Sequence, residues 1–467
     1  MRKRVIGIIV VTLFIVGIAY AGGTVTEQSF FSEALGVDQV ALVYLPADYG
    51  TSGLDYPVIY FMHGAGGGVG SWYLSALVPS LDEMIGAGII DPVIVVEPVS
   101  LQAPPPIEWQ DQGFTDMIWH FHANSELIGN YEDYLAEDVV EWVDSTYRTI
   151  ASCDHRWLFG SSAGGHGAIR LALRHPDIFS AASIHVGFMA MAEGGLGYIP
   201  VLLNATPGPP YSYAPTDGFF TATFFALSAV FAPNPDNPPW YVDFLLDENG
   251  DVDTGVHELL LAHSPTALVH DFADSGLSTK LFFRIGDQDE YSAFFWPVID
   301  ALEEEDLPYR LSVYEGTHSN PPLTECLALH LTFLNPIKAT LDISPRLADP
   351  RLMSGGMRLA LELPGDLDVA DIDCSTLEVV GIDNIQPEDA IECFGPYEIS
   401  DINGNGRDDV SVWLPCSSLV CEAFDAGASA FDVISLTVRG ELKDGRFFQA
   451  SGKFVLGIDP RNNDPIN

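Results

Sequence analysis

Short apolar runs alternate with helical patterns between about residues 40 and 333. Residues 57–62 and 93–96 are continuously apolar, which is typical of strands that are buried on both faces. Residues 131–143 place their apolar side chains at helical spacing, which gives a helix one face to pack against a sheet. This alternation predicts an α/β fold, with a mostly parallel sheet covered by helices on both faces.

The same alternation continues toward the end of this region. A strand is expected at residues 157–159, followed by a helix that includes residues 168–173 and ends at His175-Pro176. Further strands are expected at residues 183–186, 281–285 and 311–314.

One long segment, from about residue 187 to 263, interrupts the alternation and is rich in proline and aromatic residues. Long segments of this kind inside a compact domain are usually functional. We expect it to cap the active-site end of the sheet and to form an apolar wall for a substrate. The alternative is that its aromatic side chains form the core of the insertion itself.

After Asn335-Pro336 the chain changes to short β-type runs separated by turn residues, and no helical period is evident. These runs lie at residues 359–363, 377–380, 410–414, 433–438 and 453–456. Evenly spaced short strands predict a small, all-β, sandwich-like domain. We therefore expect an α/β domain at residues 22–337 and a β-domain at residues 338–467.

The first 21 residues have the pattern of a signal peptide. Arg2-Lys3-Arg4 precedes an apolar stretch at residues 5–18, and Ala19-Tyr20-Ala21 forms a small-x-small cleavage site. An uncleaved membrane anchor is the alternative, because the stretch is near the lower limit for spanning a bilayer. Since no later stretch is long and apolar enough to span, we expect a secreted, cell-surface or periplasmic protein.

The net charge of −45, from 65 acidic and 20 basic residues, excludes one class of partner. Such a surface repels a phosphate backbone, so we expect no binding to nucleic acid. The six cysteines can form disulfides in an exported protein. Four of them lie in the last quarter of the chain, where cross-links would stabilise a small domain: Cys374, Cys393, Cys416 and Cys421.

A candidate nucleophile lies between the strand at residues 157–159 and the helix after it. Ser162 is the central residue of Gly160-Ser161-Ser162-Ala163-Gly164, a GxSxG pattern. A serine on this tight turn takes strained backbone angles, and side chains at the glycine positions would collide with neighbouring backbone. The pattern predicts a nucleophile of the α/β-hydrolase type at Ser162. We interpret the competing hydroxyl of Ser161 as structural because it lies outside the glycine frame.

A serine nucleophile needs a base and an orienting acid, which follow it in the order serine, acid, histidine. Asp289 is the expected acid because it follows the strand at residues 281–285, and Asp287 is the alternative. His318 is the expected base because it follows the strand that ends at residue 314. Strand ends of this kind meet at the catalytic edge of an α/β sheet. The rival His330 lies within a helical pattern and is interpreted as a partly buried structural histidine.

Two main-chain N–H groups are expected to stabilise the oxyanion. Ala163 supplies one by its position, and Ala65, in the glycine-rich run at residues 63–68, is the candidate for the other. No Gly-Lys-Ser/Thr follows this run, so we do not expect a phosphate-binding loop. His120 and His122 alternate as on one face of a strand, but no third metal ligand is apparent. We interpret these two histidines as pocket or surface residues.

Together these motifs resemble the esterase D family. The resemblance covers about residues 38–335 and rests on His63-Gly64-Ala65-Gly66-Gly67, residues 160–168, His175 to Phe179, Gly286 to Asp289 and Gly316-Thr317-His318. That family includes S-formylglutathione hydrolases, feruloyl and acetyl-xylan esterases, siderophore esterases and bacterial mycolyltransferases. The resemblance implies an α/β-hydrolase fold without a catalytic cofactor, a triad of Ser162, Asp289 and His318, and oxyanion donors at Ala65 and Ala163. The long insertion departs from the family pattern, so the substrate stays open.

A possible calcium loop lies in the β-domain. Asp401, Asn403 and Asn405 place oxygen atoms at alternate positions and Asp409 adds a carboxylate at the ninth position. Val412 stands where an EF-hand has glutamate, so a plain polar turn is the alternative. A weaker run starts at Asp247 and lacks the glycine at its sixth position.

These features predict a secreted serine esterase that acts through an acyl-enzyme on small or polysaccharide-linked esters, such as feruloyl or acetyl esters. One alternative is an acyltransferase of the mycolyltransferase type. Another is an exported binding protein whose β-domain docks to carbohydrate or protein.

Overall fold

The computed structural model describes residues 18–19, 22–64, 76–98, 102–116, 118–320, 322–350, 356–382, 391–425, 427–457, 459 and 461. The predicted signal peptide at residues 1–21 lies outside these ranges, except for Ile18–Ala19. Ala65 also lies outside them. In the ranges that are described, no helix has both the length and the apolar character needed to cross a membrane.

A central sheet of nine strands forms the core of the first domain, in the order β1-β2-β3-β5-β4-β10-β11-β12-β13. From β5 to β13 neighbouring strands are parallel, whereas β2, β3 and β5 pair antiparallel. The α/β fold with a mostly parallel sheet is confirmed. The strands are β1 (Ile18–Ala19), β2 (Thr24–Ser32), β3 (Val37–Leu45), β4 (Val58–Met62), β5 (Ile94–Pro98), β10 (Arg156–Ser161), β11 (Ala181–His185), β12 (Lys280–Gly286) and β13 (Arg310–Tyr314).

Helices cover both faces of this sheet. Alternate side chains of its strands point to opposite sides, so the apolar strands present an apolar surface on each face. Ile59 and Phe61 of β4 share one buried cluster with α2 (Val78–Gly86) and α13 (Leu323–Leu334). Val58, Tyr60 and Met62 share the other cluster with the longer helices that lie outside the insertion. These are the continuous helix α4 (Tyr131–Asp133), π-turn (Tyr134–Asp138) and α5 (Val139–Thr146), together with α6 (Ala163–Arg174), α11 (Pro265–Ala273) and α12 (Trp296–Glu304).

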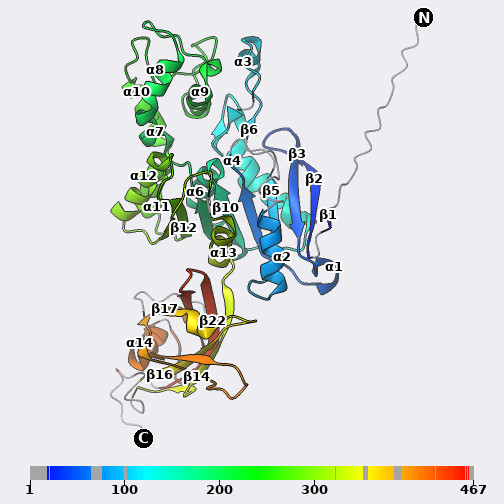
Figure 1. Cartoon of the computed structure of the whole chain (residues 1–467), viewed down its shortest axis with the longest axis vertical. Coiled ribbons are helices and arrows are strands. Elements are labelled where there is room, and N and C mark those ends of the chain that lie inside the picture. Colours follow the sequence, from blue (N-terminus) through cyan, green and yellow to red (C-terminus); the bar gives the residue numbers. More distant parts are fainter. Residues whose placement is uncertain are drawn as a thin grey trace, which may run out of the picture.

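The proline-rich insertion is mostly helical and lies on the opposite side of the central sheet from the β-domain, as Figure 1 shows in green. Phe224 and Phe225 are buried in the same cluster as residues of the sheet, so they form neither a substrate wall nor a core of the insertion alone. Phe219 is 58% exposed and is free to form a wall. The helices of the insertion are α7 (Met191–Gly194), α8 (Ile199–Ala205), α9 (Phe219–Phe231) and α10 (Thr254–Ala262).

Short elements complete the first domain. They are α1 (Tyr49–Ser52), α3 (Ile107–Asp111), β6 (Gln102–Ala103), β7 (Ile118–Trp119), β8 (Asn124–Ser125) and β9 (Gly129–Asn130). β6 pairs with β7 and β8 pairs with β9, so both form small hairpin-like ribbons outside the central sheet.

The C-terminal domain is β-rich, as predicted, and its strands belong to a single sheet curled around its own core. The segment at residues 391–400 pairs with β17 through β18 and with β20 through β19, so it joins the two ends of the sheet. The strands are β14 (Ile337–Ser344), β15 (Leu347–Ala348), β16 (Met357–Glu362), β17 (Ile372–Ile382), β18 (Ile391–Glu392), β19 (Phe394–Ser400), β20 (Asp409–Leu414), β21 (Val433–Leu442) and β22 (Phe447–Leu456).

Two expectations for this domain were wrong. The domain contains a helix, α14 (Cys416–Asp425), whose residues Leu419, Val420 and Ala423 lie at helical spacing and are buried in the core. In addition, the four cysteines of this domain are free thiols, so the disulfides that the sequence would allow here are absent from the structure.

The β-domain packs against the base of the first domain through an aromatic contact. The ring of Phe447 lies 5.6 Å from Phe282 and 5.4 Å from Phe333, and its main-chain N–H donates to Thr332 Oγ1 at 3.1 Å. The Arg439 guanidinium lies over the rings of Phe333 and Phe447, and burial lowers its pKa to about 10. Because Phe447 belongs to the same buried cluster as α2 and α13, the two domains share part of a core.

Candidate active site

Ser162 lies on the turn between β10 and α6, as the GxSxG pattern predicts. Its backbone has φ 53° and ψ −117°, a combination that non-glycine residues rarely adopt. The turn is held by main-chain hydrogen bonds: Ser162 N–H donates to His185 C=O, and Phe188 N–H donates to Ser162 C=O, both at 2.9 Å. Strained backbone of this kind persists where the surroundings fix it, which is common at functional sites.

The glycines of the motif are required by close backbone contacts. A Cβ at Gly160 would lie 2.2 Å from Gly164 O, and one at Gly164 would lie 2.0 Å from Met62 O. Both obstacles are main-chain atoms of neighbouring elements, so neither position has room for a side chain.

The structure brings Ser162, His318 and Asp289 into one hydrogen-bonded row. Ser162 Oγ lies 2.9 Å from His318 Nε2, and His318 Nδ1 lies 3.0 and 3.2 Å from the two oxygens of Asp289. The Asp289 side chain is 1% exposed, whereas that of His318 is 13% exposed. A buried carboxylate on Nδ1 orients the imidazole so that Nε2 faces the serine.

The two alternatives for acid and base have other partners. Asp287 Oδ1 accepts the main-chain N–H of Gly316 at 3.0 Å and so holds the loop that leads to His318. His330 is buried in α13, where Nδ1 lies 2.6 Å from Ser183 Oγ and Nε2 lies 3.2 Å from His185 Nδ1. Both ring nitrogens of His330 thus have partners other than the serine.

Ala163 is the first residue of α6, so its N–H points from the positive end of a 12-residue helix. Gly64 lies beside the nucleophile: a Cβ there would be 3.0 Å from Ser162 Cβ. The other expected oxyanion donor, Ala65, lies outside the described residues.

The interpretation of His120 and His122 was wrong in two respects. Both are buried, and they follow β7 in a turn where Phe121 and His122 have positive φ, so they do not alternate along a strand. The His122 ring packs against Gly167 of α6, where a Cβ would lie 2.4 Å from the ring. Burial lowers the pKa of His122 well below its usual value and that of His166 to about 3. The rings of His122, which packs against α6, and of His166, which belongs to α6, are therefore held neutral by their burial.

Aromatic neighbours of the row were not foreseen from the sequence. Tyr291 N–H donates to Asp289 Oδ1 at 2.8 Å, and its ring packs edge-on against His318 with centroids 4.9 Å apart. Phe188 packs in turn on Tyr291 at 5.4 Å. Both residues closely follow the ends of strands β11 and β12, and this position is the signal that could have identified them.

The predicted calcium loop is a turn closed by its own side chains. Asp409 Oδ2 accepts the N–H groups of Ile402 and Asn403, and Asp401 accepts those of Asn405 and Gly406. Within the described ranges no group of three or more His, Cys, Asp or Glu side chains is arranged to hold a metal ion. Calcium binding at Asp401, Asn403, Asn405 and Asp409 stays a prediction. In the weaker run, Asp253 caps α10.

The chain is similar to known esterases. Residues 32–321 match the family described as Putative esterase. Esterase Rv1288 of Mycobacterium tuberculosis is 30% identical over 160 residues, which make up 34% of this chain and 31% of that protein. An endo-1,4-beta-xylanase/feruloyl esterase of Xylanibacter ruminicola is 31% identical over 183 residues, or 38% of this chain and 22% of that protein. The chain thus matches less than a third of the length of either relative.

Solved structures with a similar course of the chain include an S-formylglutathione hydrolase from Agrobacterium tumefaciens. It has a TM-score of 0.46 and 17% identity, and the match covers 69% of this chain and 98% of that one. A ferulic acid esterase has a TM-score of 0.44 and 18% identity, with 63% of this chain and 91% of that chain covered.

Proposed function

Because the chain belongs to the Putative esterase family, we propose that it hydrolyses carboxylic esters, with Ser162 as nucleophile, His318 as base and Asp289 as orienting acid. The observation that carries this proposal is the row of hydrogen bonds from Ser162 Oγ through the imidazole to a buried carboxylate. All three residues lie within the part of the chain that matches the family.

The geometry supports a two-step reaction. As Ser162 Oγ attacks the ester carbonyl carbon, its proton passes to His318 Nε2, and the Ala163 N–H donates to the developing oxyanion. The bond to the leaving alcohol then breaks, the alcohol takes the proton from His318, and an acyl-enzyme remains. Water attacks the acyl carbon with His318 again as base, which releases the acid and restores Ser162.

Removal of the Ser162 hydroxyl tests the proposal. Ser162→Ala should lower kcat/KM for p-nitrophenyl acetate by at least about 10³-fold, because the covalent step is lost. Ser161→Ala removes the adjacent hydroxyl and is the matched control, which should stay within a fewfold of the parent. Equal rates for Ser162→Ala and the parent would refute the assignment.

The candidate substrates include feruloyl esters, since one relative is named as a feruloyl esterase, and acetyl esters, which the resemblance in sequence motifs suggests. A panel of acetyl, feruloyl and longer acyl esters ranks them by kcat/KM. Product analysis in the presence of an added alcohol separates hydrolysis from transfer: free acid as the only product supports a hydrolase, whereas an ester of the added alcohol indicates an acyltransferase.

We also propose, from the N-terminal sequence alone, that the enzyme is exported. The mass of the mature protein recovered outside the cytoplasm tests both export and cleavage after Ala21.

A further inference from the structure

A continuous row of aromatic rings leads away from the catalytic histidine. Tyr291 packs edge-on against His318, Phe188 packs on Tyr291, and Trp119 packs edge-on against Phe188 with centroids 5.8 Å apart. Phe219 extends the row beyond Trp119, at 6.1 Å. Phe188 also binds the nucleophile turn through its N–H bond to Ser162, so the row starts at both the base and the nucleophile.

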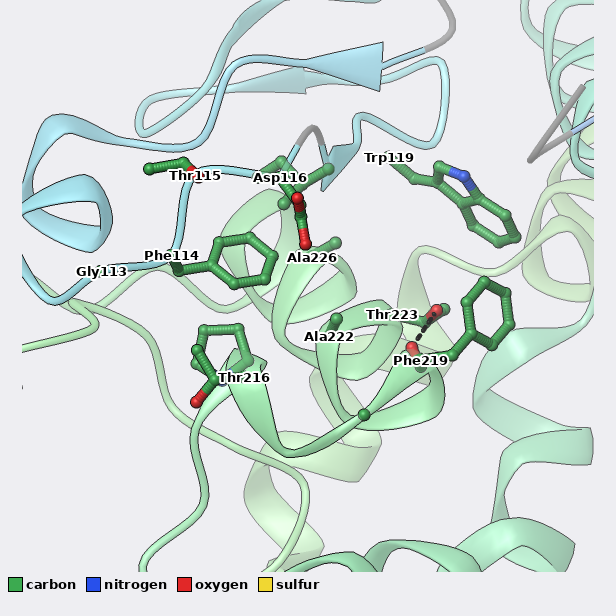
Figure 2. Close-up of a pocket in the computed structure, with 13 residues that line it drawn as sticks. Gly113, Phe114, Thr115, Asp116, Trp119, Thr216, Phe219, Ala222, Thr223 and Ala226 are labelled. Atoms are coloured by element: carbon green, nitrogen blue, oxygen red, sulfur yellow. Dashed lines mark hydrogen bonds between the residues drawn. The ribbon is translucent and has the colours of Figure 1, made fainter. Parts of the chain in front are cut away.

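The row ends at a pocket of about 520 Å³ that lies between helix α9 of the insertion and residues 113–116 and 118–119 (Figure 2). The aromatic walls of the pocket are Phe114 on one side and Trp119 with Phe219 on the other, and Ala222 and Ala226 form its base along α9. This volume lies in the range of small-molecule sites, and walls of this composition bind apolar groups. The small side chains on α9 leave the space that the aromatic residues enclose.

One carboxylate is directed into this apolar pocket. Figure 2 shows the Asp116 side chain, which is exposed, extending toward α9 between Phe114 and Trp119. A negative charge beside apolar walls repels an anionic group and disfavours its desolvation. The threonines that line the pocket, Thr115, Thr216 and Thr223, are uncharged, and among the described lining residues no cation offsets Asp116.

We propose that this pocket holds an uncharged, ring-sized arm of the ester substrate, and that Asp116 is a specificity residue that excludes esters with a carboxylate on that arm. The inference rests on the proposed esterase function. It adds a place for the part of the substrate that does not react, and it gives the insertion a role in selection.

A pocket-filling variant tests the first half. Ala222→Phe should lower kcat/KM for p-nitrophenyl 3-phenylpropanoate about tenfold or more, and leave p-nitrophenyl acetate within twofold, because acetyl does not reach the pocket. Ala222→Ser keeps the space and is the matched control. Ethyl acetate and 2-phenylethyl acetate form a second series. If Ala222→Phe lowers kcat/KM selectively for 2-phenylethyl acetate, the pocket holds the alcohol part of the substrate and not the acyl part.

A selective loss in either series supports the pocket assignment. An equal loss for all esters, or no loss for any, overturns it, and circular dichroism spectra of the variants identify a folding defect. Phe219→Ala provides a second test, because it removes an exposed ring and adds no bulk to the core. It should lower kcat/KM only for the larger esters. Its matched control is Leu259→Ala, an exposed apolar residue on α10.

The charge of Asp116 is tested by a neutral replacement. Asp116→Asn should raise kcat/KM about tenfold for p-nitrophenyl 3-(4-carboxyphenyl)propanoate. The kcat/KM for the uncharged p-nitrophenyl 3-phenylpropanoate should not change. Asp111→Asn, which removes a neighbouring exposed carboxylate outside the pocket lining, controls for the general reduction of negative charge. Equal gains in both variants would overturn the role of Asp116. If the parent hydrolyses no ester at all, the proposed function fails, and this result differs from an active parent that is insensitive to the pocket variants.

Discussion

Asp287 and Asp289 are two residues apart in one loop, yet only Asp289 reaches the imidazole of His318. Asp289 lies 3.0 Å from Nδ1 and is buried, whereas Asp287 turns the other way and accepts the N–H of Gly316. The loop thus uses one carboxylate to orient a ring and the other to fix the backbone that carries this ring.

The two aspartates should respond differently to the same substitution. Asp289→Asn should lower kcat by about 10³- to 10⁴-fold, because an amide no longer holds the imidazole in the tautomer that accepts the serine proton. Asp287→Asn retains an oxygen for the Gly316 N–H and should cost less than about tenfold. Steady-state kinetics on p-nitrophenyl acetate compares them, and a larger loss for Asp287→Asn would exchange their roles.

The nucleophile turn should not tolerate even a methyl group. Gly164→Ala places a Cβ 2.0 Å from Met62 O, so we expect a loss of at least about 2 kcal/mol in the free energy of unfolding, together with loss of activity. Gly197→Ala, where no atom lies within 4 Å of the added Cβ, is the matched control and should stay within about 0.5 kcal/mol. Urea denaturation measures both, and equal stability of the two variants would contradict the close contact.

Acid should destabilise the protein through its buried histidines. Burial lowers the pKa of His166 from 6.5 to about 3, so the folded state keeps this ring neutral while the unfolded state binds a proton below pH 6.5. The contribution of His166 to stability is therefore complete above pH 6.5 and is lost as the pH falls from 6.5 toward 3.

Replacement of His166 shows how much of the pH dependence of stability comes from protonation of this residue. His166→Gln should reduce the slope of unfolding free energy against pH, between about pH 6 and 4, by about 1.4 kcal/mol per pH unit. Urea denaturation at several pH values gives this slope, and the m-value of each variant shows whether the denatured state has changed. An unchanged slope would mean that His166 binds a proton in the folded state.

The contact between the two domains should couple their unfolding. Phe447→Ala removes a buried ring from the shared core, so we expect a loss of about 3–5 kcal/mol and a thermal transition that splits in two. Phe431→Ala, at a side chain that is 66% exposed, is the control and should leave a single transition. Differential scanning calorimetry distinguishes the outcomes, and a single transition in both variants would show that Phe447 does not carry the coupling.

Much of the first domain follows from local patterns. The apolar strands predicted at residues 57–62 and 93–96 are present as β4 (Val58–Met62) and β5 (Ile94–Pro98), and the helical spacing at residues 131–143 lies in the continuous helix from α4 to α5. These elements could be predicted because a strand buried on both faces is continuously apolar, whereas a helix buried on one face has a period of about 3.6 residues. Ser162, Asp289 and His318 could be placed because each follows a strand, and parallel strands end at one edge of the sheet.

The failures have physical reasons. His120 and His122 alternate with other residues as in a strand, but Phe121 and His122 have positive φ angles that turn the chain away from a strand course. Two successive positive φ angles without a glycine are uncommon, so the sequence gives no signal for this turn. α14 was missed although its buried residues Cys416, Leu419, Val420 and Ala423 lie at helical spacing, because this pattern covers only about two turns within a region of strand-like runs. The pocket beside Trp119 joins segments about a hundred residues apart, so only the folded chain brings Phe114 and Phe219 together.

The placement of Phe447 has a consequence for how this chain can be engineered. A ring from the C-terminal domain fills space among Phe282, Phe333 and Thr332 of the first domain, so the tail is not an interchangeable attachment. Truncation of the chain after residue 336 would expose the apolar surface of Phe282 and Phe333 to water. A different C-terminal domain could replace this one only if it supplied an apolar side chain that fills the space of Phe447.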